Sequence, residues 1–260
     1  MSEWTPNPTE LGQVLAIINA LRDPSRQDHK MAVDALNTYV QNESFVLHLV
    51  HIFIHGNDAG GIPLDIRQLA GIVTKNYVLQ KLSILPVQVQ QLLKREFLNG
   101  LGDASSEIRS TAGILFGRFA ETFPVESWVD MLPPIFQMLN LTTHQQLTLT
   151  NGALHAVKRI SEDSSHKLAV APSKPLDQMV PLLIALLPCP DATIRLGSLE
   201  SLTSMLFLIA AASEEETGEA LIARQGSQAL LTHMNSFLEV IFNAQIFPRV
   251  KLRFKMALFH

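Results

Sequence analysis

A short motif, Ile-Arg followed by small and apolar residues, recurs along the chain at a regular interval. It is written IRQLAGIVTKN at 66–76, IRSTAGILFGR at 108–118 and IRLGSLESLTS at 194–204. The first two copies are 42 residues apart and the third follows after 86, with a copy that lacks the arginine, LTLTNGALHAVKR, at 147–159. A period near 40 residues made of two helices is typical of HEAT and armadillo repeats. Because such units bury their apolar faces only by stacking, we predict an all-α fold: a HEAT-repeat α-solenoid, a right-handed superhelix of about six helix pairs.

The apolar residues are spaced as in amphipathic helices almost throughout, with short polar breaks between paired segments. The expected helices cover 9–21, 25–40, 43–55, 64–82, 86–101, 105–123, 125–139, 144–163, 175–187, 191–212 and 227–242. Asp23 is expected to cap the second of these helices, with Pro24 in its first turn. We therefore assign residues 1–242 to the solenoid.

The last 18 residues, NAQIFPRVKLRFKMALFH (243–260), do not follow the repeat pattern. They carry basic residues and no acid, and basic and apolar residues alternate over 249–255 as they do in a strand. We treat this segment as a divergent C-terminal tail. It is either a repeat without its normal continuation or a basic segment that binds a partner.

The arginines of the motif, Arg67, Arg109 and Arg195, each lie in the first turn of an expected second helix. An acid precedes each arginine, which is favourable because a carboxylate there faces the positive end of the helix dipole. We interpret the three arginines as structural: each can pair with an acid in the adjacent repeat and so set how the repeats stack. A direct binding role is the alternative.

Glycines also recur at one position of the repeat, at Gly71, Gly113 and Gly152. A glycine inside a helix costs about 1 kcal/mol relative to alanine. Its recurrence at one position therefore predicts that two helices approach each other closely there.

The composition excludes several classes of function. The net charge of −4, with 17% charged residues, does not provide the basic surface that binding to nucleic acid requires. No apolar stretch reaches the roughly 20 residues that cross a bilayer, so no membrane insertion is expected. The single cysteine, Cys189, cannot form an internal disulfide and has no base beside it in the sequence. This fits a reducing intracellular compartment and gives no reason to expect a catalytic thiol.

The search for catalytic and metal-binding patterns finds one candidate. His48, His51 and His55 share one helical face, but the segment HLVHIFIH supplies no fourth ligand, so we expect a polar helix face and no metal. No phosphate-binding loop with a lysine and no Gly-x-Ser-x-Gly elbow is present. We therefore expect neither an enzyme nor a cofactor.

Several phrases of the sequence, taken in order and spacing, resemble the N-terminal repeats of the transportin branch of the importin-β (karyopherin-β) family of nuclear transport receptors. These phrases are EWTPNPTELGQVLAIINALRDPS, IRQLAGIVTKN, FLNGLGDASSEIRSTAGILFGRFA, WVDMLP and NGALHAVKRISEDS. The resemblance runs from about Glu3 to Phe242. It implies a HEAT solenoid whose second helices line a concave face.

The resemblance also implies partners and residues that contact them. In this family the N-terminal repeats bind the GTPase Ran in its GTP form, and the early outer surface contributes to contacts with Phe-Gly nucleoporins. The phrase TKN implies that Lys75 and Asn76 face Ran, and the phrase SEDS implies the same for Glu162 and Asp163. The implied location is the cytoplasm, the nucleus and the nuclear pore.

The chain departs from the family in length, since family members run to roughly 20 repeats and their cargo groove lies beyond residue 260. No cargo site is therefore expected here. Two alternatives stay open beside a receptor or its N-terminal fragment. One is a HEAT-repeat scaffold for another protein assembly, because fold alone does not fix function. The other is a truncated regulatory form of the receptor.

Overall fold

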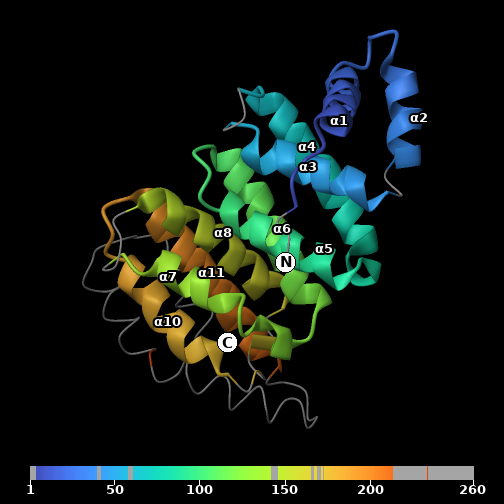
Figure 1. Ribbon diagram of the computed structural model, residues 1–260. Helices are drawn as coiled ribbons and strands as arrows, with labels where there is room; N and C mark the ends of the chain where they lie inside the picture. The colour runs from blue at the N-terminus through green and yellow to red at the C-terminus, as the bar shows by residue number, and fades with distance from the viewer. Residues whose placement is uncertain are drawn as a thin grey trace. The chain divides into compact units, whose positions relative to one another are not determined.

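The computed structural model describes residues 4–39, 42–57, 61–141, 146–164, 167–168, 171, 173–212 and 233. Every regular element within these residues is helical, which confirms the predicted all-α class (Figure 1). Apart from His233, the predicted sixth helix pair from 227–242 and the tail 243–260 lie outside the described residues. None of the helices in the described part is long and apolar enough to span a membrane.

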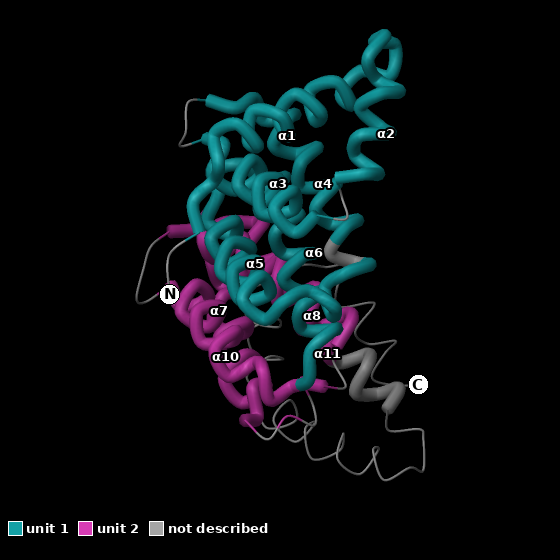
Figure 2. Tube along the Cα trace, turned by 45° about the vertical axis from the view of Figure 1, so that its right-hand side comes forward, with its two compact units in different colours: residues 1–124 teal, residues 125–260 magenta. Residues whose placement is uncertain are grey.

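The chain forms two compact units, Met1–Pro124 and Val125–His260 (Figure 2). Each unit has its own set of paired helices.

Unit 1 contains three helix pairs (Figure 1). Its elements are α1 (Pro8–Leu21), α2 (His29–Tyr39), α3 (Glu43–His55), α4 (Leu64–Lys81), a 3₁₀ turn at Leu82–Ile84, α5 (Val87–Gly100) and α6 (Ser106–Thr122). Within each pair the second helix packs on the first. Between pairs, α1 packs on α3 and α3 on α5, whereas α4 packs on α6. This separation into a layer of first helices and a layer of second helices is the stacking predicted for HEAT repeats.

The described residues of unit 2 form two helix pairs in the same arrangement. It contains a 3₁₀ turn at Val125–Trp128, α7 (Leu132–Leu139), α8 (Leu147–Asp163), α10 (Pro175–Leu186) and α11 (Ala192–Ala212). The first helices α7 and α10 pack together, and so do the second helices α8 and α11. The backbone of Gly197 in α11 lies so close to α8 that a methyl group there would be 3.2 Å from Leu154.

Two predicted helix boundaries are wrong. The second helix starts at His29, not near residue 25, because the Asp23 carboxylate accepts hydrogen bonds from the backbone and hydroxyl of Ser25 and closes a turn instead of capping a helix. The helix expected over 125–139 begins only at Leu132. Pro133 and Pro134 lack the N–H groups that a helix interior needs, so they fit only in its first turn.

The core of unit 1 is built on phenylalanines from several helices. Phe53, Phe97 and Phe116 have no exposed surface, and each buried ring contributes roughly 1.5–3 kcal/mol. Gly71 of α4 lies directly against Phe53 of α3: a methyl group on Gly71 would be 2.6 Å from the ring. The close helix approach predicted at this glycine is therefore present.

Candidate partner-binding site

Arg67 is almost completely buried, with 4% of its surface exposed. Its guanidinium donates to the carbonyl oxygens of Phe53 and Ile54, both at 3.2 Å, in the last turn of α3. It also forms an ion pair with Asp103, which lies in the turn before α6. Arg67 thus connects both helices of its own pair to the next pair, which is the kind of contact expected for a repeat arginine.

Arg109 and Arg195 share a different geometry. Nη1 of Arg109 donates to the carbonyls of Asp103 and Ala104 at 2.8 and 2.9 Å. Nη1 of Arg195 donates to the carbonyls of Cys189 and Pro190 at 2.7 and 2.8 Å. In both cases the acceptors lie just beyond the C-terminal end of the first helix of the same pair. These contacts lie within a repeat, whereas the sequence predicted contacts between repeats.

Lys75 and Asn76 lie in the second half of α4, in unit 1. Asn76 is exposed and Lys75 is half-buried, while Thr74 and Tyr77 on either side of them in the sequence face the core. One turn earlier on the outward side, Ile72 leaves 46% of its surface exposed. The outward face of α4 therefore combines an amide, a cation and an apolar side chain.

Glu162 and Asp163 end α8, in unit 2. Glu162 is half-buried and pairs with Arg159 at 2.9 Å, and Asp163 is exposed. Carboxylates at the C-terminal end of a helix face the negative end of its dipole, which is unfavourable by about 0.3–1 kcal/mol each. Two acids in this position therefore make a negative site that a basic partner would stabilise. The structure gives this pair and the pair on α4 separate places in the two units.

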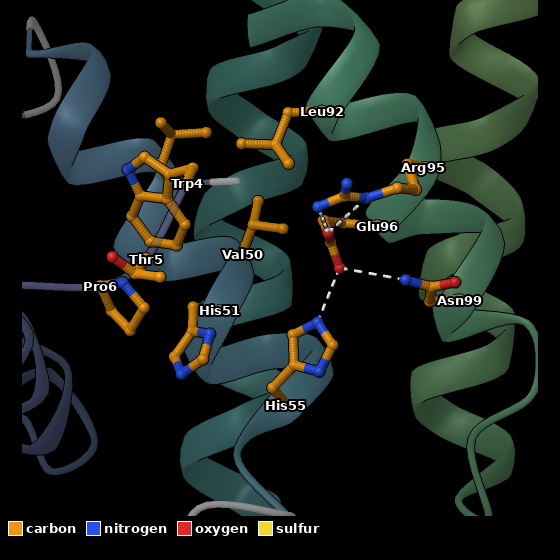
Figure 3. A pocket seen from close by; sticks show the side chains of 11 residues that line it. Trp4, Thr5, Pro6, Val50, His51, His55, Leu92, Arg95, Glu96 and Asn99 are labelled. Atoms are coloured by element: carbon orange, nitrogen blue, oxygen red, sulfur yellow. Dashed lines mark hydrogen bonds and ion pairs between the residues drawn. The ribbon is translucent and has the colours of Figure 1, made fainter. Parts of the chain in front are cut away.

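A pocket of about 410 Å³ lies between the first helices α3 and α5 of unit 1 (Figure 3). Residues 4–6 and α3 form one side of the pocket, and α5 forms the other. Its lining is apolar at Leu47, Val50 and Leu92 and polar at its far end. It is a groove on the layer of first helices, on the other layer from Lys75 and Asn76.

The polar end of the groove is centred on Glu96 of α5, which is buried. Its carboxylate accepts hydrogen bonds from His55 at 2.6 Å, from Arg95 at 2.9 Å and from Asn99 at 3.2 Å. Burial acts to raise the pKa of Glu96, but the hydrogen bonds from His55, Arg95 and Asn99 hold that pKa below its ordinary value. Sequence reasoning missed this cluster. The available signal was an acid beside Phe97 on the apolar stripe of α5, where a charge needs partners.

The three histidines of α3 do not converge on one point. His48 faces the core and has 1% of its surface exposed, whereas His51 and His55 line the groove. Over the described residues, no group of three histidine, cysteine or acidic side chains is arranged to hold a metal ion.

The comparisons with known proteins place the chain beside the transportins. It is 28% identical over 254 residues to transportin from Dictyostelium discoideum, covering 97% of this chain and 25% of that protein. It is 26% identical over 243 residues to transportin-1 from Homo sapiens, covering 92% of this chain. It is 25% identical over 245 residues to importin subunit beta-2 from Schizosaccharomyces pombe. The resemblance that the sequence phrases indicated is therefore confirmed.

The chain spans about a quarter of the length of the curated relatives it matches. No family model matches it. Among solved structures, a designed armadillo repeat protein aligns with 84% of the chain at a TM-score of 0.38 and 14% identity.

Proposed function

We propose that this chain is part of a nuclear transport receptor of the transportin type and that it binds the GTP form of Ran through its second helices. The observation that carries the proposal is the similarity to transportins along 92–97% of the chain. The receptor works in protein import and moves between cytoplasm and nucleus through the nuclear pore. Its mechanism is binding without catalysis.

On α4, the partner contact consists of Asn76 and Lys75 with Ile72 beside them. An exposed apolar side chain bordered by polar groups is the usual composition of an interface centre and its rim. The opposite face of α4 is fixed in the core by Tyr77 and Thr74. The helix therefore holds its outward residues in place before a partner arrives, which lowers the entropy lost on binding.

On α8, the contact consists of Glu162 and Asp163. Their position at the negative end of the helix dipole gives a partner's lysine or arginine a larger electrostatic gain than two isolated acids would. Arg159 holds Glu162 in one orientation. The bound surface on Ran is expected to be basic here.

Selectivity for the GTP form follows from the switch segments of Ran, whose conformation depends on the nucleotide. A receptor that contacts these segments in one conformation binds the two nucleotide forms of Ran with different affinities. The free energy by which Ran binding changes the affinity for cargo equals the free energy by which cargo binding changes the affinity for Ran. Cargo itself is not assigned to this part of the receptor.

The test is a titration calorimetry series with Ran loaded with a non-hydrolysable GTP analogue or with GDP. Wild-type chain should bind only the GTP form. Asn76→Ala and Glu162→Lys should each weaken binding by roughly 10-fold or more. The matched controls are Gln88→Ala on α5 and Asp177→Lys on α10; both residues are exposed and lie on first helices. Equal binding of both nucleotide forms, or equal loss in the controls, would refute the proposal and favour a HEAT scaffold of another assembly.

A second contact, with Phe-Gly nucleoporins, is favoured by the groove between α3 and α5. A space of about 410 Å³ lined by Leu47, Val50 and Leu92 accommodates one aromatic side chain and the glycine that follows it. The polar groups at its end can hydrogen-bond the peptide backbone. A labelled Phe-Gly repeat peptide should bind the wild-type chain and the Gln91→Lys control, since Gln91 is exposed on α5 outside the groove. It should not bind Leu92→Lys.

A further inference from the structure

The segment that closes the groove, residues 4–7, contacts two histidines of α3 and is hydrogen-bonded to one of them, His48. We call these residues the N-terminal strap. The backbone N–H of Asn7 donates to Nε2 of His48 at 3.1 Å, and the indole of Trp4 lies edge-on to the His48 ring with centroids 5.2 Å apart. Trp4 also contacts His51 edge-on at 6.2 Å. The strap therefore rests on two of the three histidines that the sequence places on one face of α3.

The hydrogen bonds of His48 define its protonation state. A backbone N–H can only donate, so Nε2 must accept and carries no proton. Nδ1 lies 2.7 Å from the carbonyl oxygen of Ser44, which can only accept, so Nδ1 carries the proton. His48 holds the strap only as this neutral tautomer.

Adding a proton to His48 would place an N–H on Nε2 opposite the N–H of Asn7. Two donors 3.1 Å apart repel each other, and the hydrogen bond between the strap and α3 is lost. The carboxylate of Glu10 on α1, 3.7 Å from Nδ1, compensates the new positive charge.

The other charged groups around α3 do not replace this contact. Glu96 of α5 accepts a hydrogen bond from Arg95 and is hydrogen-bonded to His55. Arg67 of α4 reaches only the carbonyls of the last turn, and Glu43 lies in the first turn of α3. Among the described ionisable side chains, Glu10 is the one whose carboxylate pairs with His48.

We propose that His48 is a pH-sensitive latch for the N-terminal strap: when it is neutral, Trp4, Thr5 and Pro6 form one wall of the groove, and when it is protonated the strap detaches and the wall is lost. Histidine is the side chain that changes charge between about pH 5 and 8. The consequence for peptide binding rests on the proposed nucleoporin contact, but the latch itself does not.

The first experiment measures the exposure of Trp4 in the full chain by acrylamide quenching between pH 8 and pH 5.5. The chain has two tryptophans, and the other, Trp128, is 2% exposed in unit 2 and serves as the internal reference for the fold. Subtraction of a Trp4→Phe variant isolates the Trp4 signal. We expect the quenching constant of Trp4 to rise at least about threefold between pH 8 and pH 5.5. Circular dichroism should show unchanged helix content.

Two variants separate the latch from general acid effects. His48→Gln places an amide oxygen near the Nε2 position, so it keeps an acceptor for Asn7 that cannot be protonated, and Trp4 should stay covered at both pH values. His51→Gln, which removes the other ring under Trp4, should leave the pH dependence in place. The proposal is overturned if Trp4 exposure does not change in wild type, or if it changes equally in His48→Gln. ¹⁵N spectra of the wild-type histidines give the tautomer independently: a proton on Nε2 of His48 at pH 8 would also overturn it.

The second experiment measures Phe-Gly peptide binding at pH 7.5 and 6.0. Trp4→Ala at pH 7.5 should bind as weakly as wild type at pH 6.0, and His48→Gln should bind equally well at both pH values. Equal affinity of Trp4→Ala and wild type at pH 7.5 would show that the strap is not a wall of the site. If the peptide binds no variant at any pH, the nucleoporin contact is refuted, while the quenching data still decide the latch.

Discussion

Replacement of Gly71 by alanine tests how closely α3 and α4 are packed. The new methyl carbon would lie 2.6 and 2.7 Å from two carbons of the Phe53 ring, and real Cβ contacts essentially never come below 3.0 Å. The ring has no exposed surface and cannot turn away without displacing other core residues. Overpacking of this kind costs typically about 1–3 kcal/mol. Alanine gains about 1 kcal/mol in helix propensity, so we expect a net loss of stability of up to about 2 kcal/mol.

Gly12 is the matched control for this substitution. It lies in the interior of α1, and a methyl group there would meet nothing within 4 Å. Gly12→Ala should therefore stabilise unit 1 by about 0.5–1 kcal/mol, because only the propensity gain remains. The same chemical change is thus predicted to have opposite signs at two helical glycines of the same unit.

The assay is urea denaturation followed by circular dichroism, with hydrogen exchange of α3 and α4 to locate the change in unit 1. Phe53→Leu in the Gly71→Ala background provides a double-mutant cycle, and the smaller side chain should recover at least about 1 kcal/mol of coupling energy. If Gly71→Ala is as stable as Gly12→Ala, α3 and α4 are not packed as closely as described. The interpretation of the recurring glycine would then be wrong.

Two further predictions concern buried charges. Arg67→Met should destabilise the fold by about 3 kcal/mol in urea denaturation, because Asp103 and two carbonyls lose their partner; Arg67→Lys should recover part of the loss, and an effect below about 0.5 kcal/mol would contradict the role of this residue. The pKa of Glu96 is lowered in the folded protein, so its ionised carboxylate stabilises the fold. This contribution to the free energy of unfolding is complete above the ordinary pKa of 4.5 and is lost as the pH falls through the lower pKa of the folded state. Denaturation midpoints between pH 6 and pH 3 should therefore fall for wild type, and part of that fall should be absent in Glu96→Gln; equal slopes in both would show that Glu96 does not contribute.

Helix positions could be predicted well where a local signal was strong. The predicted helix at 43–55 coincides with α3, because Asn42 caps it by accepting a hydrogen bond from Ser44 and an uninterrupted apolar run follows. The start of α2 could not be predicted, since an aspartate before a proline serves equally well in a turn and as a helix cap. Here the contact between Arg26 and Asp28 at 2.9 Å extends the turn.

The groove between α3 and α5 could not be predicted from the sequence for a different reason. Its parts are 41 residues apart, as His55 and Glu96 show, and the strap adds a segment from the start of the chain. No local period connects a tryptophan at position 4 to a histidine at position 51. The sequence showed the three histidines on one face but not that His48 turns inward to hold a backbone N–H.

The recurring arginine has a simpler explanation than stacking of neighbouring repeats. Arg67 donates to carbonyls in the last turn of the first helix in its own pair, whereas Arg109 and Arg195 donate to carbonyls in the turn between the two helices of theirs. The carbonyls of Phe53 and Ile54 in the last turn of α3 have no partner within the helix and form the negative end of its dipole, where a cation is most favourable. An arginine one turn into the second helix is the residue that can reach them across a short turn. The motif recurs because each hairpin must close its own turn, and Arg67 also links its pair to Asp103 in the next pair.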